Sequence, residues 1–141
     1  MGLVAVVRHW RERLFAEKPL GERGERLADR FLRRLGYKII GRHVRLPSGE
    51  LDLVALDGRT IVFVEVKTRE SDQHGHASEA VTPVKQRRLT RLAVTFLSRH
   101  RLHDHPARFD VVAITWPPGE KPRIEHFKNA FEAVGQGEFY S

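Results

Sequence analysis

Residues 49–67 carry the sequence GELDLVALDGRTIVFVEVK, in which two apolar runs flank the pair Asp57-Gly58. An Asp-Gly pair between two such runs is a strong signal for a two-residue hairpin turn. We therefore predict antiparallel strands from Leu51 to Leu56 and from Thr60 to Lys67. Apolar residues occupy both faces of both strands, which indicates that other elements cover both faces of the sheet.

The residues around this hairpin predict the remaining helices and strands. Leu27 and Ala28 belong to an apolar stripe at helical spacing that ends before the stop signal Gly36. Thr82 and Pro83 suit the cap and the first position of a second helix. The predicted elements are, in chain order, a helix from Glu22 to Leu35, a strand from Tyr37 to Arg45, the two hairpin strands, a helix from Thr82 to about His100, a strand from Arg108 to Thr115, a short strand from Arg123 to Phe127 and a helical turn from Asn129 to Val134. The core order α-β-β-β-α-β predicts an α/β fold, a three-layer α/β/α sandwich with a mixed central sheet.

The composition indicates one folded domain with a basic surface. The 141 residues include 25 Lys+Arg and 18 Asp+Glu, a formal net charge of +7. We predict a basic amphipathic extension over residues 1–20 and one domain over residues 21–141, since this length is typical of a single domain. The charge favours a polyanionic partner, nucleic acid first and an anionic membrane surface second. The alternative, a basic soluble protein that binds no polyanion, stays open at this point.

The sequence lacks the features needed for disulfides, for zinc sites with cysteine ligands and for membrane spans. The chain has no cysteine, which excludes disulfides and zinc sites with cysteine ligands. No apolar run approaches the length of a membrane span. We therefore expect a cytoplasmic protein without a membrane partner.

Three charged residues stand where the strand pattern calls for apolar ones. Alternation puts Glu65 and Lys67 on one face of their strand, and the hairpin pairing brings Asp52 beside them. Burying two carboxylates side by side is unfavourable unless something neutralises them. A divalent cation, aided by the Lys67 ammonium, would do so. The alternative is a buried lysine–carboxylate group without chemistry.

Several stretches together resemble a known family. They are GERGE at 21–25, LGY at 35–37, GELDL at 49–53, VFVEVKTR at 62–69, AVT at 80–82 and KQRR at 85–88. This ordered set closely resembles the bacterial YraN-like family, which has been assigned to the restriction-endonuclease-like, PD-(D/E)xK nuclease superfamily. It is also similar to archaeal Holliday-junction resolvases. One departure is that the proline of the superfamily motif is absent, because Leu51 precedes Asp52.

The resemblance implies a nuclease-like domain over residues 21–141 and a metal site within it. Asp52 and Glu65 would bind Mg²⁺ or Mn²⁺, hard cations that prefer oxygen ligands, and Lys67 would orient a water molecule or offset charge on the phosphate. Glu25 would complete the metal shell, as a first-helix glutamate does in the resolvase-like relatives; alternatively it complements the helix dipole. Glu50 would support Asp52 from the same face, or is a solvated strand start.

The implied function is a metal-dependent endonuclease that hydrolyses phosphodiester bonds in DNA, selective for branched or single-stranded structures. The resolvase-like relatives also suggest a homodimer. Two alternatives stay open: a catalytically silent nucleic-acid-binding module with the same fold, and an adaptor that binds proteins through the N-terminal segment.

Further polar residues are candidates for nucleic-acid binding. Lys85 and Gln86 fall on the inner side of the second helix near its N-terminus, where they could reach a phosphate. Arg69, Arg87 and Arg88 could follow a nucleic-acid backbone, although a charge run is usually a solvated face.

We predict no catalytic or metal-binding role for the paired histidines or for Asp110. The pairs His74/His76 and His103/His105 suggest zinc, but no third ligand stands at a suitable place, so we expect loop histidines without a role. Asp110 enters a strong strand, and we expect it to pair with Arg108 or another neighbour.

Overall fold

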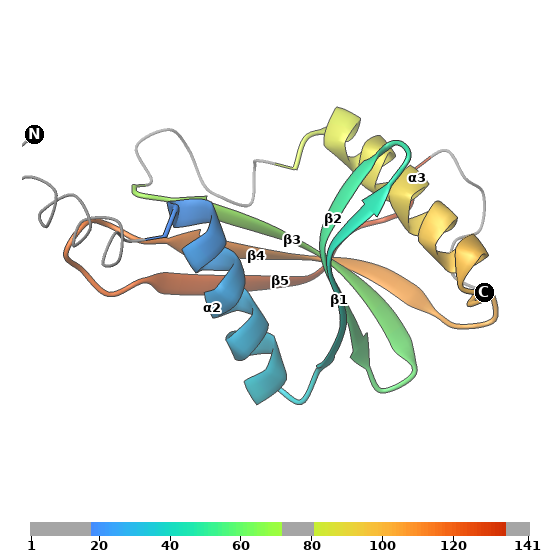
Figure 1. The fold of residues 1–141 in the computed structure, drawn as a ribbon, viewed down its shortest axis with the longest axis horizontal. Helices are drawn as coiled ribbons and strands as arrows, with labels where there is room; N and C mark the ends of the chain where they lie inside the picture. Colours follow the sequence, from blue (N-terminus) through green and yellow to red (C-terminus); the bar gives the residue numbers. More distant parts are fainter. Residues whose placement is uncertain (1–17, 72–80, 135–141) are drawn as a thin grey trace, which may run out of the picture.

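The computed structural model describes residues 18–71 and 81–134. Its elements are α2 (Leu20–Arg34), β1 (Lys38–Leu46), β2 (Gly49–Asp57), β3 (Thr60–Arg69), α3 (Pro83–Arg99), β4 (Ala107–Thr115) and β5 (Arg123–Phe131). The strands form one mixed sheet in the order β1-β2-β3-β4-β5 (Figure 1). All neighbouring strands are antiparallel except β3 and β4, which are parallel and are connected through α3. The expected α/β class with a mixed sheet is confirmed.

The helices α2 and α3 pack against opposite sides of the sheet, as the alternation along β3 makes clear. Val62 and Val64 join the apolar cluster that includes Ala28 and Leu32 of α2. Their neighbours Ile61 and Phe63 join the cluster that includes Leu89, Leu92, Ala93, Phe96 and Leu97 of α3. This explains why β3 is apolar on both faces from Ile61 to Val64: between two helical covers, side chains on both faces of the strand are buried.

The Asp57-Gly58 turn sets the register of β2 against β3. Gly58 has φ +61°, a left-handed conformation that glycine adopts readily, and the pairing runs from Asp57↔Thr60 to Leu53↔Val64. Beyond this pair, a side chain replaces the backbone contact between the strands: Asp52 Oδ2 accepts a hydrogen bond of 2.9 Å from the Val66 N–H. Asp52 is thereby held against β3 beside Glu65.

A close contact fixes the start of α2 over β3. A Cβ atom added to Gly24 would lie 1.8 Å from the Thr68 Oγ1 atom, so only glycine permits this approach. The next residue along the helix is Glu25, whose position depends on the same contact.

The predicted helical turn from Asn129 to Val134 is wrong, because β5 continues to Phe131. Asn129 adopts φ +53°, and the β4–β5 register shifts between Phe109 and Val111. This bulge changes the spacing of apolar residues from that of a regular strand, and Phe131 pairs with Phe109 and stacks on it at 4.5 Å between ring centroids.

Most of the predicted N-terminal extension and the pair His74/His76 lie outside the described residues. Within residues 18–71 and 81–134, no helix combines the length and the apolar character needed to cross a membrane.

Candidate metal centre

Asp52 and Glu65 are two largely desolvated carboxyl groups that lie close enough to shift each other's pKa, at the point where β2 and β3 cease to pair. Burial, and then the charge of Asp52, raise the pKa of Glu65 to about 7. Burial also raises the pKa of Asp52, against the opposing effect of the hydrogen bond from the Val66 N–H. Two carboxyls in contact retain a proton between them near neutral pH unless another cation takes its place.

The chemistry of this pair fits a hard divalent cation. Carboxylate oxygens are the ligands that Mg²⁺ and Mn²⁺ prefer, and Mg²⁺ commonly binds one or two carboxylates and keeps several waters. Among residues 18–71 and 81–134, no group of three or more acidic or histidine side chains is arranged to hold a metal ion. The sequence-predicted ligands Asp52 and Glu65 are thus brought together, whereas Glu25 does not join them in a three-ligand group.

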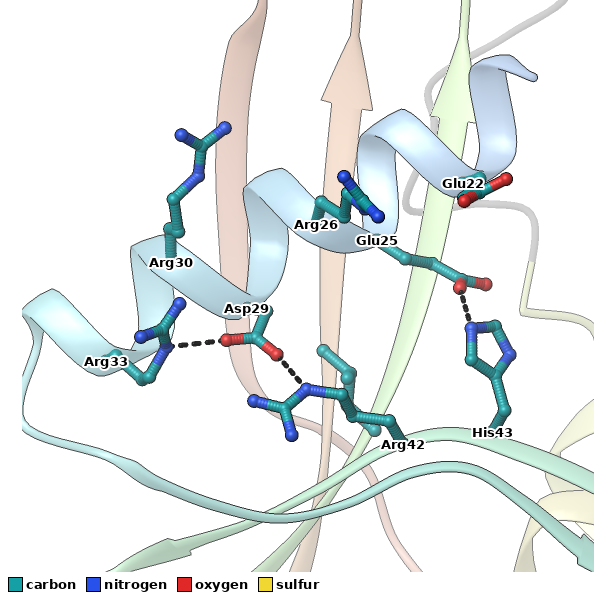
Figure 2. A pocket seen from close by; sticks show the side chains of 9 residues that line it. Glu22, Glu25, Arg26, Asp29, Arg30, Arg33, Arg42 and His43 are labelled. Atoms are coloured by element: carbon teal, nitrogen blue, oxygen red, sulfur yellow. Dashed lines mark hydrogen bonds and ion pairs between the residues drawn. The ribbon is translucent and has the colours of Figure 1, made fainter. Parts of the chain in front are cut away.

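Glu25 is instead engaged by a histidine that sequence reasoning did not select. Its Oε2 atom lies 2.7 Å from His43 Nε2, and Figure 2 shows this contact reaching from α2 to β1. The other ring nitrogen, Nδ1, lies 2.8 Å from Glu50 Oε1. His43 therefore connects two of the predicted site residues.

The position of His43 follows from strand pairing. It lies between the β1–β2 pairs Arg42↔Leu53 and Val44↔Leu51, hence across from Asp52. The hydrogen bond with Glu50 is the main cause that raises the pKa of His43. Burial and then the charge of Asp52 are the main causes that raise the pKa of Glu25. His43 also adopts φ +48°, which is uncommon for a residue other than glycine.

Lys67 and Arg69 follow Glu65 on the same face of β3, because they are two and four residues further along the strand. Both side chains are half-buried. The Arg69 carbonyl accepts a hydrogen bond of 2.7 Å from the Trp116 N–H, which ties the end of β3 to the end of β4.

The first turns of α3 bring positive charge to the carboxyl pair. The charges of Arg88 and Lys85 both act to lower the pKa of Glu65. Arg88 Nη1 lies 3.9 Å from the place of a Cβ on Gly49, so its guanidinium lies against the start of β2. The Gln86 side chain binds the backbone before α3, because its Nε2 atom donates a hydrogen bond of 3.1 Å to the Val81 carbonyl. Arg87 is exposed.

A second buried charged cluster lies on β4 and β5. The Asp110 side chain has no exposed surface, and it contacts Arg108 Nε at 3.0 Å and His126 Nε2 at 2.7 Å. The Asn129 N–H donates a third hydrogen bond at 3.0 Å. The expected pairing of Asp110 with Arg108 is confirmed, and its partners account for this buried carboxylate without a ligand.

Comparisons with known proteins identify relatives over most of the chain. The model of the uncharacterised protein family UPF0102 matches residues 24–114. A UPF0102 protein of Geobacter sulfurreducens is 53% identical over 115 residues, covering 82% of this chain and 90% of the relative. A UPF0102 protein of Symbiobacterium thermophilum is 50% identical over 114 residues, covering 81% and 97%. The predicted resemblance to the YraN-like family is confirmed, and this chain belongs to the uncharacterised family UPF0102.

Proposed function

We propose that this protein is a Mg²⁺- or Mn²⁺-dependent endonuclease that hydrolyses phosphodiester bonds in DNA. The observation that carries the proposal is the pair of neighbouring carboxyl groups of Asp52 and Glu65, with Asp52 held against β3 by the Val66 N–H, which fits a hard cation and lies near the positive charges of α3. A mixed sheet with a helix packed on each side supports a restriction-endonuclease-like, three-layer sandwich as the fold. The basic net charge of +7 supports a polyanionic substrate.

Asp52, Glu65 and Lys67 would have separate roles in phosphodiester hydrolysis. A bound divalent cation would polarise the phosphodiester and lower the pKa of a water molecule. Asp52 and Glu65 would hold it with carboxylate oxygens and would give up their shared proton on binding. The Val66 N–H keeps Asp52 in place through the 2.9 Å hydrogen bond. Lys67 would orient the attacking water or offset charge that develops on the phosphate.

Residues around the pair would position the nucleic acid. Lys85 and Arg88 bring positive charge close to Glu65, where the oxygens of a phosphate group would need it. Glu50 would act on Asp52 through its contact with His43 rather than by binding the cation.

One observation favours a second candidate, a nucleic-acid-binding module without catalysis. Glu25, the expected third ligand, is engaged by His43 at 2.7 Å. With two protein carboxylates, cation affinity would be lower than with three. This candidate shares the nucleic-acid binding and lacks the cleavage.

A cleavage panel separates the two candidates. Labelled duplex, single-stranded, flap and four-way-junction DNA, and RNA, are incubated with Mg²⁺ or Mn²⁺ and with wild type, Asp52→Asn, Lys67→Ala or Asp104→Asn. Asp104 is exposed, so its variant is a control for the loss of one carboxylate. We expect the Asp52 and Lys67 variants to lose about 100-fold or more in rate, and the Asp104 variant to match wild type. Equal activity in all four proteins would assign the cleavage to a contaminant, and binding without any cleavage would favour the silent module.

A further inference from the structure

A pocket of about 650 Å³ lies between α2 and β1, apart from the Asp52–Glu65 pair. Its size is within the range of ligand pockets. Four arginines line it: Arg26, Arg30 and Arg33 from α2, and Arg42 from β1. Figure 2 shows Arg30, Arg33 and Arg42 toward one end of this arginine pocket and Glu25 with His43 toward the other.

A buried carboxylate orients two of these arginines. The Asp29 side chain is only 8% exposed, and its two oxygens accept hydrogen bonds from Arg33 Nε at 2.6 Å and from Arg42 Nε at 2.5 Å. Burial acts to raise the pKa of Asp29, but the two guanidiniums outweigh it and hold the pKa below its ordinary value. Asp29 is therefore ionised and fixes both guanidiniums.

This arrangement leaves donors and charge for a ligand. Arg33 and Arg42 each donate to Asp29 through the Nε atom, so these two hydrogen bonds do not involve the terminal Nη groups. The Arg33 and Arg42 side chains are 54% and 56% exposed. The four lining arginines face three carboxylates, Glu22, Glu25 and Asp29, which leaves one net positive charge, and His43 adds to it when protonated. Oriented guanidiniums with terminal donors match the oxygens of a phosphate group.

We propose that the arginine pocket binds a backbone phosphate of a nucleic-acid strand, at a position outside the cleavage site. The pocket is continuous with Glu25 and His43, and Glu25 lies close enough to Asp52 for their charges to interact. A strand held at the carboxyl pair would therefore continue over the helix α2 face. The identity of the polymer rests on the proposed endonuclease function, whereas phosphate binding in the pocket rests on the arginines alone.

The test is binding of a fluorescein-labelled single-stranded oligonucleotide, followed by anisotropy in EDTA over a range of salt concentrations. The double variant Arg33→Gln/Arg42→Gln is compared with Arg59→Gln/Arg99→Gln, which removes the same charge from two exposed positions outside the pocket. We expect the pocket variant to bind about tenfold more weakly than wild type. Its slope of log K against log salt should fall by about 1.4, from two lost contacts at about 0.7 each. Equal weakening in both double variants, or no binding by wild type, would overturn the proposal.

Two further variants guard against misfolding and against a mere effect of net charge. Arg26→Gln/Arg30→Gln removes lining arginines that do not hold Asp29, and it should also weaken binding with an unchanged melting temperature. Asp29→Asn makes the protein more positive by one charge, yet it should weaken binding because the guanidiniums lose their anchor. Tighter binding by Asp29→Asn would overturn the role of Asp29.

The outcome is separable from that of the endonuclease proposal. Binding in EDTA needs no cleavage, so an inactive protein whose pocket variants bind weakly supports the pocket and refutes the nuclease. An active protein whose pocket variants bind like the control supports the nuclease and refutes the pocket.

Discussion

Replacing Glu65 by glutamine is expected to stabilise the metal-free protein at alkaline pH. In the unfolded chain this carboxyl has a pKa near 4.5, whereas burial and Asp52 raise the pKa to about 7 in the folded protein. A tenfold change in an acid dissociation constant corresponds to about 1.4 kcal/mol. The full difference between the two pKa values would correspond to about 3 kcal/mol. Asp52 titrates together with Glu65 and accounts for part of this difference, so we expect the ionised form of Glu65 to destabilise the fold by about 2 to 3 kcal/mol. Glutamine has the same shape and cannot ionise.

The sign of the pH dependence follows from the raised pKa of Glu65. The folded state holds the proton more tightly, so the stabilisation by the proton is complete below pH 4.5 and is lost as the pH rises through about 7. The advantage of Glu65→Gln over wild type should therefore be near zero at pH 4.5 or below and reach about 2 to 3 kcal/mol at pH 8.

Urea unfolding in EDTA, followed by circular dichroism at several pH values, measures this difference. A saturating concentration of Mn²⁺ should then stabilise wild type and not Glu65→Gln, since only a ligand that binds the native state shifts its stability. A variant that is less stable than wild type at pH 8, or a difference that does not change with pH, would refute the account of the carboxyl pair.

Three other substitutions test the surroundings of the site. Asp110→Ala should lower the free energy of unfolding by about 3 kcal/mol in urea titrations, because Arg108 and His126 lose a buried counter-charge, although Arg108 keeps its ion pair with Asp57 at 3.0 Å. Gly24→Ala should lower it by about 1–3 kcal/mol, since the added Cβ meets a β3 hydroxyl at 1.8 Å. Gly21→Ala, which has open space around it, serves as its control in the same melting experiment. Arg88→Ala should raise the pKa of Glu65 further, because it removes a charge that lowers it, and carboxyl NMR titration would detect the change.

The parts of the site that depend on local sequence could be predicted. The Asp57-Gly58 turn determines the hairpin register, and that register alone brings Asp52 to Glu65. The alternation of β3 placed Lys67 on the same face. These inferences needed only strand geometry and a turn type with one preferred residue pair.

The parts that depend on contacts between distant segments could not be predicted. His43 looked like one of eight unremarkable histidines, and its role comes from a left-handed backbone and from α2 packing over β1. Asp29 and Arg33 are four apart on a helix, a spacing that suggests an ion pair. Their partner Arg42 comes from another element, and no local pattern indicated it. Arg88 resembled a solvated charge until the fold placed it near Glu65.

Binding of Mn²⁺ to the metal-free protein tests the central claim most directly. Isothermal titration calorimetry at pH 6.5, in two buffers of different ionisation enthalpy, gives both the affinity and the number of protons released. Wild type should bind Mn²⁺ with release of up to about one proton, since the cation replaces the proton shared by Asp52 and Glu65. Asp52→Asn should bind at least about tenfold more weakly, and Asp104→Asn should bind like wild type. Equal affinity in wild type and Asp52→Asn, or binding without proton release, would contradict the assignment of this pair as a metal centre.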